Sequence, residues 1–149
     1  MPHLSDGQEL PRVVSGSHEI VNTLVVCAAV IERDGLFLVT RRQKGVHLEG
    51  YWEFPGGKCR SGETLTTCLA RELREELDVE VDVGKEVFTT THVYPERAVE
   101  LHFLKCDLRG EPIPRLGQQM RWATRDELAQ LPFPPADIEL IRMLTRGTP

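Results

Sequence analysis

The residues most able to do chemistry in this chain are three carboxylates in the short stretch RELREEL. Glu72, Glu75 and Glu76 are spaced i, i+3 and i+4, which places them on one face of a helix. Like charges at this spacing destabilise a helix by roughly 0.2–0.5 kcal/mol per pair unless a cation offsets them. Taken alone, such a stretch is more often a solvated helix surface, with Arg71 and Arg74 supplying that charge. An oxygen-rich cluster also suits Mg²⁺ or Mn²⁺, which prefer carboxylate ligands.

A pair of glycines lies upstream of these carboxylates, in the stretch EFPGGK at residues 53–58. Glycine lets the backbone turn sharply, and it lets a carbonyl oxygen approach an ion that a Cβ would obstruct. The hypothesis to test is that Gly56, Gly57 and the carboxylates belong to one metal site.

The acidic residues need a helix to hold them, and the sequence predicts one. Ser61 or Gly62 is expected to open it, and Glu63 suits its positive N-terminal end. Apolar residues recur on a separate stripe, at Leu65, Cys68, Leu69, Leu73 and Leu77. The acidic face is therefore not the face that packs on the core.

The rest of the chain alternates between strand and helix patterns, without repeats or linkers. Strands are expected at 22–32, 36–42, 79–94, 98–108 and 120–123, and further helices at 124–131 and 136–147. The first of these strands is apolar throughout, as expected of a strand buried on both faces. We expect a loose tail over residues 1–20 and one α/β (α+β) domain over residues 21–149, with a mixed sheet covered by helices.

Composition excludes several classes of protein. The chain has 149 residues and a net charge of -5, which argues against binding to polymeric nucleic acid or an anionic membrane. No apolar run approaches the ~20 residues that span a bilayer, and the first twenty residues lack the apolar region of a signal peptide. Four cysteines show no CxxC spacing, so we expect buried thiols in a reducing, cytoplasmic environment.

The stretch from Gly57 to Val79 resembles the signature of the Nudix hydrolases. That signature reads Gly, five residues, Glu, seven residues, Arg-Glu, an aliphatic residue, one residue, Glu-Glu, one residue, Gly and an aliphatic residue. The matching positions are Gly57, Glu63, Arg71, Glu72, Leu73, Glu75, Glu76 and Val79. Asp78 departs from the pattern, because it stands where the family has glycine. Aspartate tolerates the left-handed conformation expected there better than most residues do.

The resemblance implies a fold, a metal and a reaction. It implies the Nudix fold, in which a mixed β-sheet is sandwiched between helices. Glu72, Glu75 and Glu76 would bind Mg²⁺, with Mn²⁺ as a possible substitute, together with the backbone carbonyl of Gly56. Glu63 and Arg71 would orient the helix and its ligands. The bound metal would neutralise a di- or triphosphate and activate the attacking water.

Outside the signature, residues 22–147 resemble the MutT-like branch, which cleaves nucleoside triphosphates to the monophosphate and pyrophosphate. By position, Arg42 and Arg97 would contact substrate phosphate or sugar, and Phe54 would line the base pocket. Asp137 would read the base edge, or it would serve only as the N-cap of the last helix. Its chemistry leaves 8-oxo-dGTP and plain or modified CTP both open as substrates. Leu116 stands where such enzymes often carry an additional glutamate.

We therefore expect a cytoplasmic, Mg²⁺-dependent nucleoside triphosphate pyrophosphohydrolase, monomeric or homodimeric, that removes oxidised nucleotides before they reach DNA and so contributes to DNA repair. A CTP or modified-pyrimidine pyrophosphohydrolase is the alternative within the same class. From another class, the chain could be a module that senses nucleotides without cutting them. Such modules typically lose glutamates of the signature, and this chain retains all three.

Overall fold

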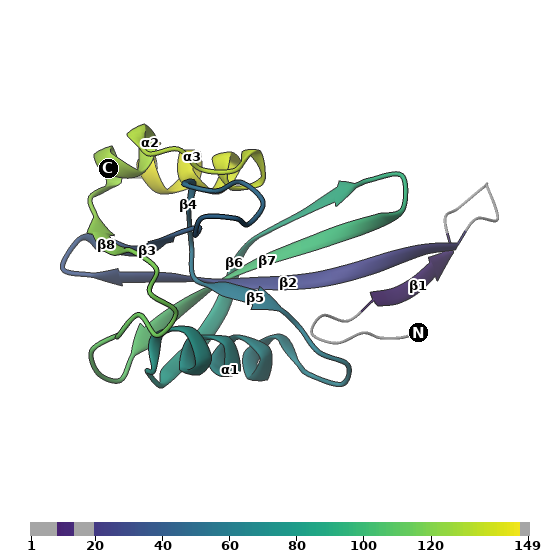
Figure 1. Ribbon diagram of the computed structural model, residues 1–149, viewed down its shortest axis with the longest axis horizontal. Coiled ribbons are helices and arrows are strands. Elements are labelled where there is room, and N and C mark those ends of the chain that lie inside the picture. Colours follow the sequence, from purple (N-terminus) through teal and green to yellow (C-terminus); the bar gives the residue numbers. More distant parts are fainter. Residues whose placement is uncertain (1–8, 14–19, 147–149) are drawn as a thin grey trace.

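The computed structural model describes residues 9–13 and 20–146, which form one mixed sheet with helices on both of its faces (Figure 1). The central strands follow the order β4-β3-β2-β7-β6, and β1, β5 and β8 pair with β2, β2 and β3. The strands are β1 (Glu9–Val13), β2 (Ile20–Arg33), β3 (Leu36–Arg41), β4 (Trp52–Glu53), β5 (Gly56–Lys58), β6 (Val81–Val93), β7 (Arg97–Leu108) and β8 (Met120–Ala123). The helices are α1 (Leu65–Leu77), α2 (Arg125–Gln130), the 3₁₀ turn η1 (Pro135–Asp137) and α3 (Ile138–Arg146). The expected α+β architecture is confirmed.

Strand β2 is the centre of the sheet and is buried on both faces. It runs parallel to β7 and antiparallel to β3 and β5, so the sheet is mixed. Side chains alternate along the strand: Cys27, Ala29 and Ile31 pack toward α1, whereas Ala28 and Val30 pack toward α2 and α3. The apolar run is continuous because both faces of this strand need apolar residues.

The signature helix begins later than the sequence suggested. Thr64, and not Ser61 or Gly62, is the N-cap, and it forms a capping box with Thr67. Glu63 therefore lies outside the helix, where it is free to contact other side chains. At the other end Asp78 adopts the expected left-handed conformation, with φ of 52°. Helix α2 also begins with a capping box, between Thr124 and Glu127.

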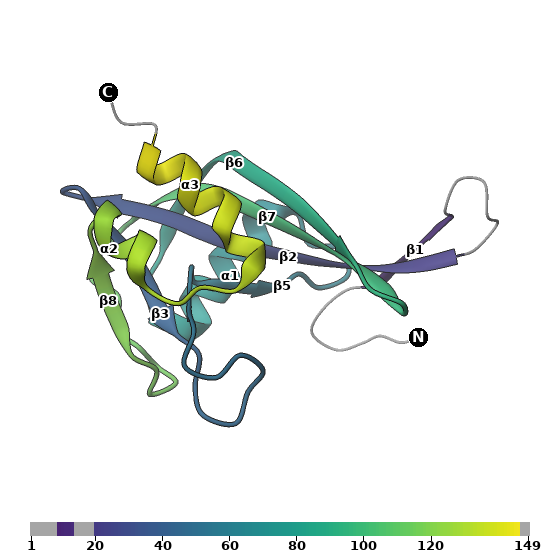
Figure 2. The same ribbon diagram turned by 90° about the horizontal axis from the view of Figure 1, so that it is seen from above.

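Part of the segment expected to be a loose tail forms a strand. Residues Glu9–Val13 pair antiparallel with residues 20–24 at the start of β2. Seen from above, β2 and the β6–β7 hairpin extend together beyond the helices toward β1 (Figure 2). The remainder of residues 1–19 lies outside the described part of the chain.

The expectation that all four cysteines are free thiols is wrong for two of them. Cys59 and Cys68 form a disulfide, with their Cα atoms 5.2 Å apart, while Cys27 and Cys106 are free and buried. The pair is separated by nine residues, a spacing with no recognised signature. The two residues meet because Cys68 lies on the buried face of α1, and this face packs against the loop that carries Cys59.

None of the helices described in residues 9–13 and 20–146 is both long and apolar enough to cross a membrane.

Candidate active site

The glycine pair is required because two parts of the molecule approach it closely. A Cβ on Gly56 would collide with the backbone of Cys27 and Ala28, where β5 pairs with β2. A Cβ on Gly57 would collide with the carboxylate of Glu72. The pair thus lets β5 lie against β2 and lets an α1 carboxylate lie against β5. Glycines and carboxylates belong to one site.

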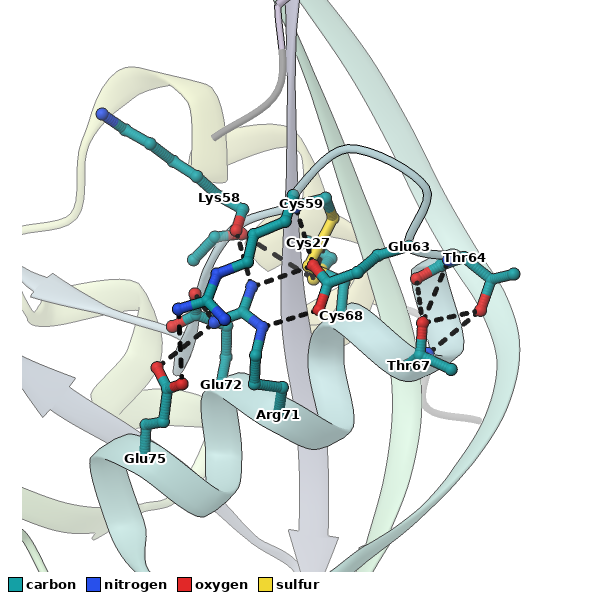
Figure 3. Close-up of polar contacts among 12 residues, drawn as sticks. Cys27, Lys58, Cys59, Glu63, Thr64, Thr67, Cys68, Arg71, Glu72 and Glu75 are labelled. Atoms are coloured by element: carbon teal, nitrogen blue, oxygen red, sulfur yellow. Dashed lines mark hydrogen bonds and ion pairs between the residues drawn. A yellow bond between two sulfur atoms is a disulfide. The ribbon is translucent and has the colours of Figure 1, made fainter. Parts of the chain in front are cut away.

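Arg71 connects the carboxylates of the signature (Figure 3). Its guanidinium donates to Glu63 at 2.6 and 3.0 Å, to Glu72 at 3.0 Å and to Glu75 at 3.2 Å. It also donates to the Lys58 carbonyl at 3.0 Å, which joins α1 to the end of β5. The hydrogen bond from Arg71 lowers the pKa of Glu63, and the same contact raises the pKa of Arg71. Arg71 and Glu63 are thus placed to orient the helix and its acids.

Glu72 and Glu76 form a crowded acidic pair beside the glycines. Burial raises the pKa of Glu72 even though the neighbouring Arg71 guanidinium lowers it. Burial, and then the charges of Glu72 and Glu53, raise the pKa of Glu76 to about 9. A hydrogen bond to the Gly56 backbone opposes this rise. Two carboxylates that repel each other in a partly buried position need a cation to be ionised together.

These residues fit a hard divalent cation. Glu72, Glu75 and Glu76 offer carboxylate oxygens from one helical face, and the Gly56 backbone lies against Glu76. Oxygen donors of this kind suit Mg²⁺ or Mn²⁺, and the nitrogen atoms nearest to them, those of the Arg71 guanidinium, are hydrogen-bond donors that cannot bind a metal.

A cleft of about 760 Å³ runs from this acidic centre to the other face of the sheet. At one end it is lined by Gly56, Gly57 and Glu76. Its wall includes Leu101 and the edge-to-face pair Phe54 and Phe103, whose ring centroids lie 6.0 Å apart. Other lining residues are Arg42, His47, Leu48, Glu53, His92, Tyr94, Pro134, Pro135 and Asp137. A flat, partly apolar ligand with an anionic end matches this shape.

Asp137 also lines the cleft and is almost fully buried, with 6% of its surface exposed. Burial, and then the charge of Glu53, raise the pKa of Asp137 to about 7, against the lowering effect of Arg42. Arg42 is held by an ion pair with Glu53 at 2.8 Å. No side chain caps the η1 turn, whose N-cap is Pro134. The structure therefore places Asp137 as a cleft-facing carboxyl.

The lining of the cleft differs in part from the set of residues predicted from the sequence. Arg97 begins β7 opposite Asn22 and is outside the lining of the cleft, so its contact with substrate stays a prediction. Glu53, His92 and Tyr94 line the cleft without having been singled out. Glu53 is close in sequence to the glycine pair in EFPGGK, and this proximity could have indicated that it lies at the site. His92 and Tyr94 carry no local signal, because only the β6–β7 pairing brings them there.

The loop position of Leu116 was identified from the resemblance, and it does lie near the acidic centre. Leu116 and Glu76 share the lining of a smaller cavity of about 160 Å³. The neighbouring Arg115 backbone N–H donates to the Glu76 carbonyl at 2.9 Å. Leu116 is exposed and apolar, so it supplies no additional carboxylate.

Comparison with known proteins agrees with this geometry. Residues 26–143 match the model of the NUDIX domain. The chain is 38% identical over 117 residues to the CTP pyrophosphohydrolase of Escherichia coli, covering 78% of this chain and 87% of that protein. It is also 38% identical over 137 residues to a putative 8-oxo-dGTP diphosphatase 2 of Mycobacterium tuberculosis, covering 85% and 91% of the two chains.

A solved structure shows the same likeness. The MutT protein of methicillin-resistant Staphylococcus aureus 252, described as a Nudix hydrolase, is 35% identical, with a TM-score of 0.71 over 86% of this chain and 99% of that one. The matched range of this chain, residues 26–143, includes the signature whose carboxylates lie beside the glycine pair. This chain belongs to the Nudix hydrolase family.

Proposed function

We propose that this chain hydrolyses oxidised nucleoside triphosphates, such as 8-oxo-dGTP, to the nucleoside monophosphate and pyrophosphate, with Mg²⁺ as the metal. One observation carries the proposal: a single cleft joins the acidic centre at Glu76 to the apolar pocket that ends at Asp137. A nucleoside triphosphate has an anionic chain at one end and a flat, polar-edged base at the other, so it matches both ends of this cleft.

The residues of the acidic centre would divide the work between metal binding and positioning. Glu72, Glu75 and Glu76 would hold Mg²⁺, with the Gly56 carbonyl as a backbone ligand. Bound there, Mg²⁺ would neutralise the phosphates and lower the pKa of the attacking water. Arg71 keeps the glutamates in register through its hydrogen bonds, and Glu63 holds Arg71 in turn.

Substrate would be held by side chains along the cleft. Arg42 lies on the path between the acidic centre and the base pocket, where a cation can contact phosphate or sugar. We assign Arg97 the same kind of contact only if the β6–β7 hairpin bends toward the substrate. With Leu116 in place of an acid, Glu72 or Glu76 would take the role of general base.

The base end supports a guanine or a cytosine. When it is ionised, the Asp137 carboxylate can accept hydrogen bonds from N1–H and N2–H₂ of a guanine, while Phe54 packs against the ring. When it is protonated, Asp137 can donate to N3 of cytosine and accept from its N4–H₂. The second candidate is therefore a CTP pyrophosphohydrolase, and the Escherichia coli relative of that name favours it.

We further propose that the protein acts in the cytoplasm as a monomer or homodimer and does not bind polymeric nucleic acid. The net charge of -5 supports the last point, because polymeric nucleic acid is bound through basic surfaces. Removal of oxidised nucleotides from the precursor pool would give it a role in DNA repair.

The test is a panel of normal and oxidised nucleoside triphosphates, each incubated with Mg²⁺, with Mn²⁺ and with a chelator, and resolved by chromatography. We expect monophosphate and pyrophosphate, no turnover with the chelator, and the highest kcat/KM for 8-oxo-dGTP. Highest kcat/KM for CTP would select the second candidate. Nucleotide binding without turnover under any condition would contradict both and identify a sensing module.

A further inference from the structure

A cluster of three sulfur atoms lies beside the acidic centre, where Cys68 precedes Glu72 by one turn of α1 (Figure 3). Cys27 on β2, Cys59 after β5 and Cys68 on α1 each offer a sulfur, and all three sulfurs lie within 4.8 Å of one another. Their exposed fractions are 0%, 3% and 0%. Cys106, the remaining cysteine, belongs to the same core but not to this cluster.

The disulfide ties the metal-binding helix to the sheet. The Cys59 backbone N–H donates to the Val25 carbonyl at 2.9 Å, which fixes Cys59 to β2. Through its bond to Cys59, Cys68 fixes the first turns of α1 at a point three residues before Arg71. The segment enclosed by the disulfide contains Glu63, which holds Arg71 (Figure 3). The covalent bond and the ion-pair network thus restrain the same helix end.

The third sulfur is placed to help break and remake this bond. Cys27 Sγ lies 3.0 Å from Cys68 Sγ and 3.6 Å from Cys59 Sγ. Because Cys68 carries no proton in the disulfide, Cys27 must be the donor in this hydrogen bond.

We propose that Cys59 and Cys68 form a reversible redox site that controls the metal affinity of the acidic centre, with the Cys27 thiol as proton donor. A dithiol reductant would attack Cys59, which is buried but is the least buried of the three sulfurs and lies between the exposed residues Lys58 and Arg60. The Cys59–Cys68 bond breaks, and Cys68 leaves as a thiolate stabilised by the Cys27 S–H. The second thiol of the reductant then releases Cys59, giving two protein thiols and one reductant disulfide. A small-molecule disulfide reverses the reaction and is itself reduced to two thiols.

Reduction removes the covalent tie between α1 and the segment after β5, and leaves the ion pairs and the apolar packing of the helix to hold it. Glu72 packs on Gly57, and Glu72, Glu75 and Glu76 all lie on α1, so a shift of the helix relative to β5 moves these ligands together away from the Gly56 carbonyl. Groups that orient metal ligands typically change metal affinity by about 10- to 100-fold when they are lost. We expect the reduced protein to bind Mn²⁺ about 10-fold more weakly than the oxidised protein.

The experiment uses the full chain, equilibrated in mixtures of reduced and oxidised dithiothreitol. Thiols are alkylated after denaturation and counted by intact mass, and Mn²⁺ alone is titrated by calorimetry. We expect two alkylated cysteines in the oxidised form, as Cys27 and Cys106 are free, and four in the reduced form. Cys59→Ser should have the weak Mn²⁺ affinity in both conditions, whereas the control Cys106→Ala should respond as the native chain does. Neither readout requires nucleotide hydrolysis.

The role of Cys27 is tested by comparing the rates at which two Cys27 variants are reduced. Cys27→Ser keeps a hydrogen-bond donor and should retain the reduction rate, whereas Cys27→Ala should slow reduction by about 10-fold, because the leaving thiolate loses its donor. Equal rates in the two variants would remove Cys27 from the proposal. Four alkylated cysteines before any reductant, or equal Mn²⁺ affinity in both forms, would overturn the redox site. A fall in melting temperature alone would identify a purely structural cross-link.

Discussion

The two ends of the cleft are built in different ways. The acidic end comes from one continuous segment, in which β5, a loop and α1 bring Gly56, Gly57 and Glu76 together within 21 residues. The base end is assembled from distant segments: Phe54 from the loop after β4, Leu101 from β7 and Asp137 from η1. The acidic end can therefore stay constant while the base end changes with its loops. We expect the first end to determine the chemistry and the second end to determine which nucleotide is the substrate.

The largest expected effect is at the acidic end. Glu75→Gln or Glu76→Gln should each lower kcat by at least about 100-fold for every nucleotide, because each removes a charge that holds the metal. The fold should persist, as measured by circular dichroism and melting temperature.

Glu80→Gln is the matched control, since Glu80 is exposed and pairs only with Arg74 at 3.7 Å in the described structure. Its activity should equal that of the native chain. Native activity in Glu75→Gln and Glu76→Gln as well would restore the interpretation of RELREEL as a solvated helix surface.

The next largest effect is expected from a substitution at the base end, which should change the selectivity among nucleotides. Asp137→Ala should narrow the ratio of kcat/KM between the preferred nucleotide and its undamaged counterpart by about 10- to 100-fold. A pocket that hydrogen-bonds a polar edge loses discrimination when that partner is removed. The measurement is kcat/KM for both nucleotides with each protein. A lower melting temperature with an unchanged ranking would contradict base reading and leave Phe54 and the 43–52 loop as determinants.

The same contrast between local and distant construction explains what the sequence allowed us to predict. Helix α1, β2 and the glycine pair were predictable because their information is local: periodicity, an apolar run and fixed spacing. The predicted start at Ser61 or Gly62 is three or two residues too early, because Thr64 caps the helix through a capping box whose partner is Thr67 and not an acidic residue. The acid at that point, Glu63, instead serves Arg71.

Features that depend on packing could not be predicted. The disulfide needs Cys59 and Cys68 to meet across a turn of α1, and no cysteine spacing encodes that meeting. The sequence left two roles open for Asp137, helix cap and cleft residue, because a residue directly before a helix can have either role. In the structure Asp137 is buried, lines the cleft and is influenced by the charges of Glu53 and Arg42, which the sequence does not reveal.

A smaller effect concerns pH. The pKa of Asp137 is raised to about 7, so its carboxyl is protonated below that pH and ionised above it. Ionised Asp137 matches the two donors of guanine and repels N3 of cytosine, whereas the protonated form matches cytosine. The ratio of kcat/KM for guanine over cytosine nucleotides should therefore rise several-fold from about pH 6 to about pH 8.5.

Asp137→Asn cannot titrate, so the ratio in this variant should stay constant over the same range. Comparing the two nucleotides at each pH cancels effects on the shared acidic end, including any titration of Glu76. A ratio that rises equally in the native chain and in Asp137→Asn would show that another group, with Glu53 the nearest candidate, sets base choice.

The smallest expected effect is at Asp78, at the end of α1. Its left-handed φ of 52° favours glycine, the residue that the family carries there, whereas its ion pair with Arg115 at 3.1 Å favours aspartate. An exposed pair of this kind contributes roughly 0.2–1 kcal/mol, and relief of the left-handed strain contributes a similar amount. Asp78→Gly should therefore change the free energy of unfolding by less than about 1 kcal/mol in urea denaturation. Asp78→Ala loses the pair and keeps the strain, so it should be the less stable variant. A loss above about 1 kcal/mol in Asp78→Gly that Arg115→Ala does not reproduce would show that Asp78 has a further role at the helix end.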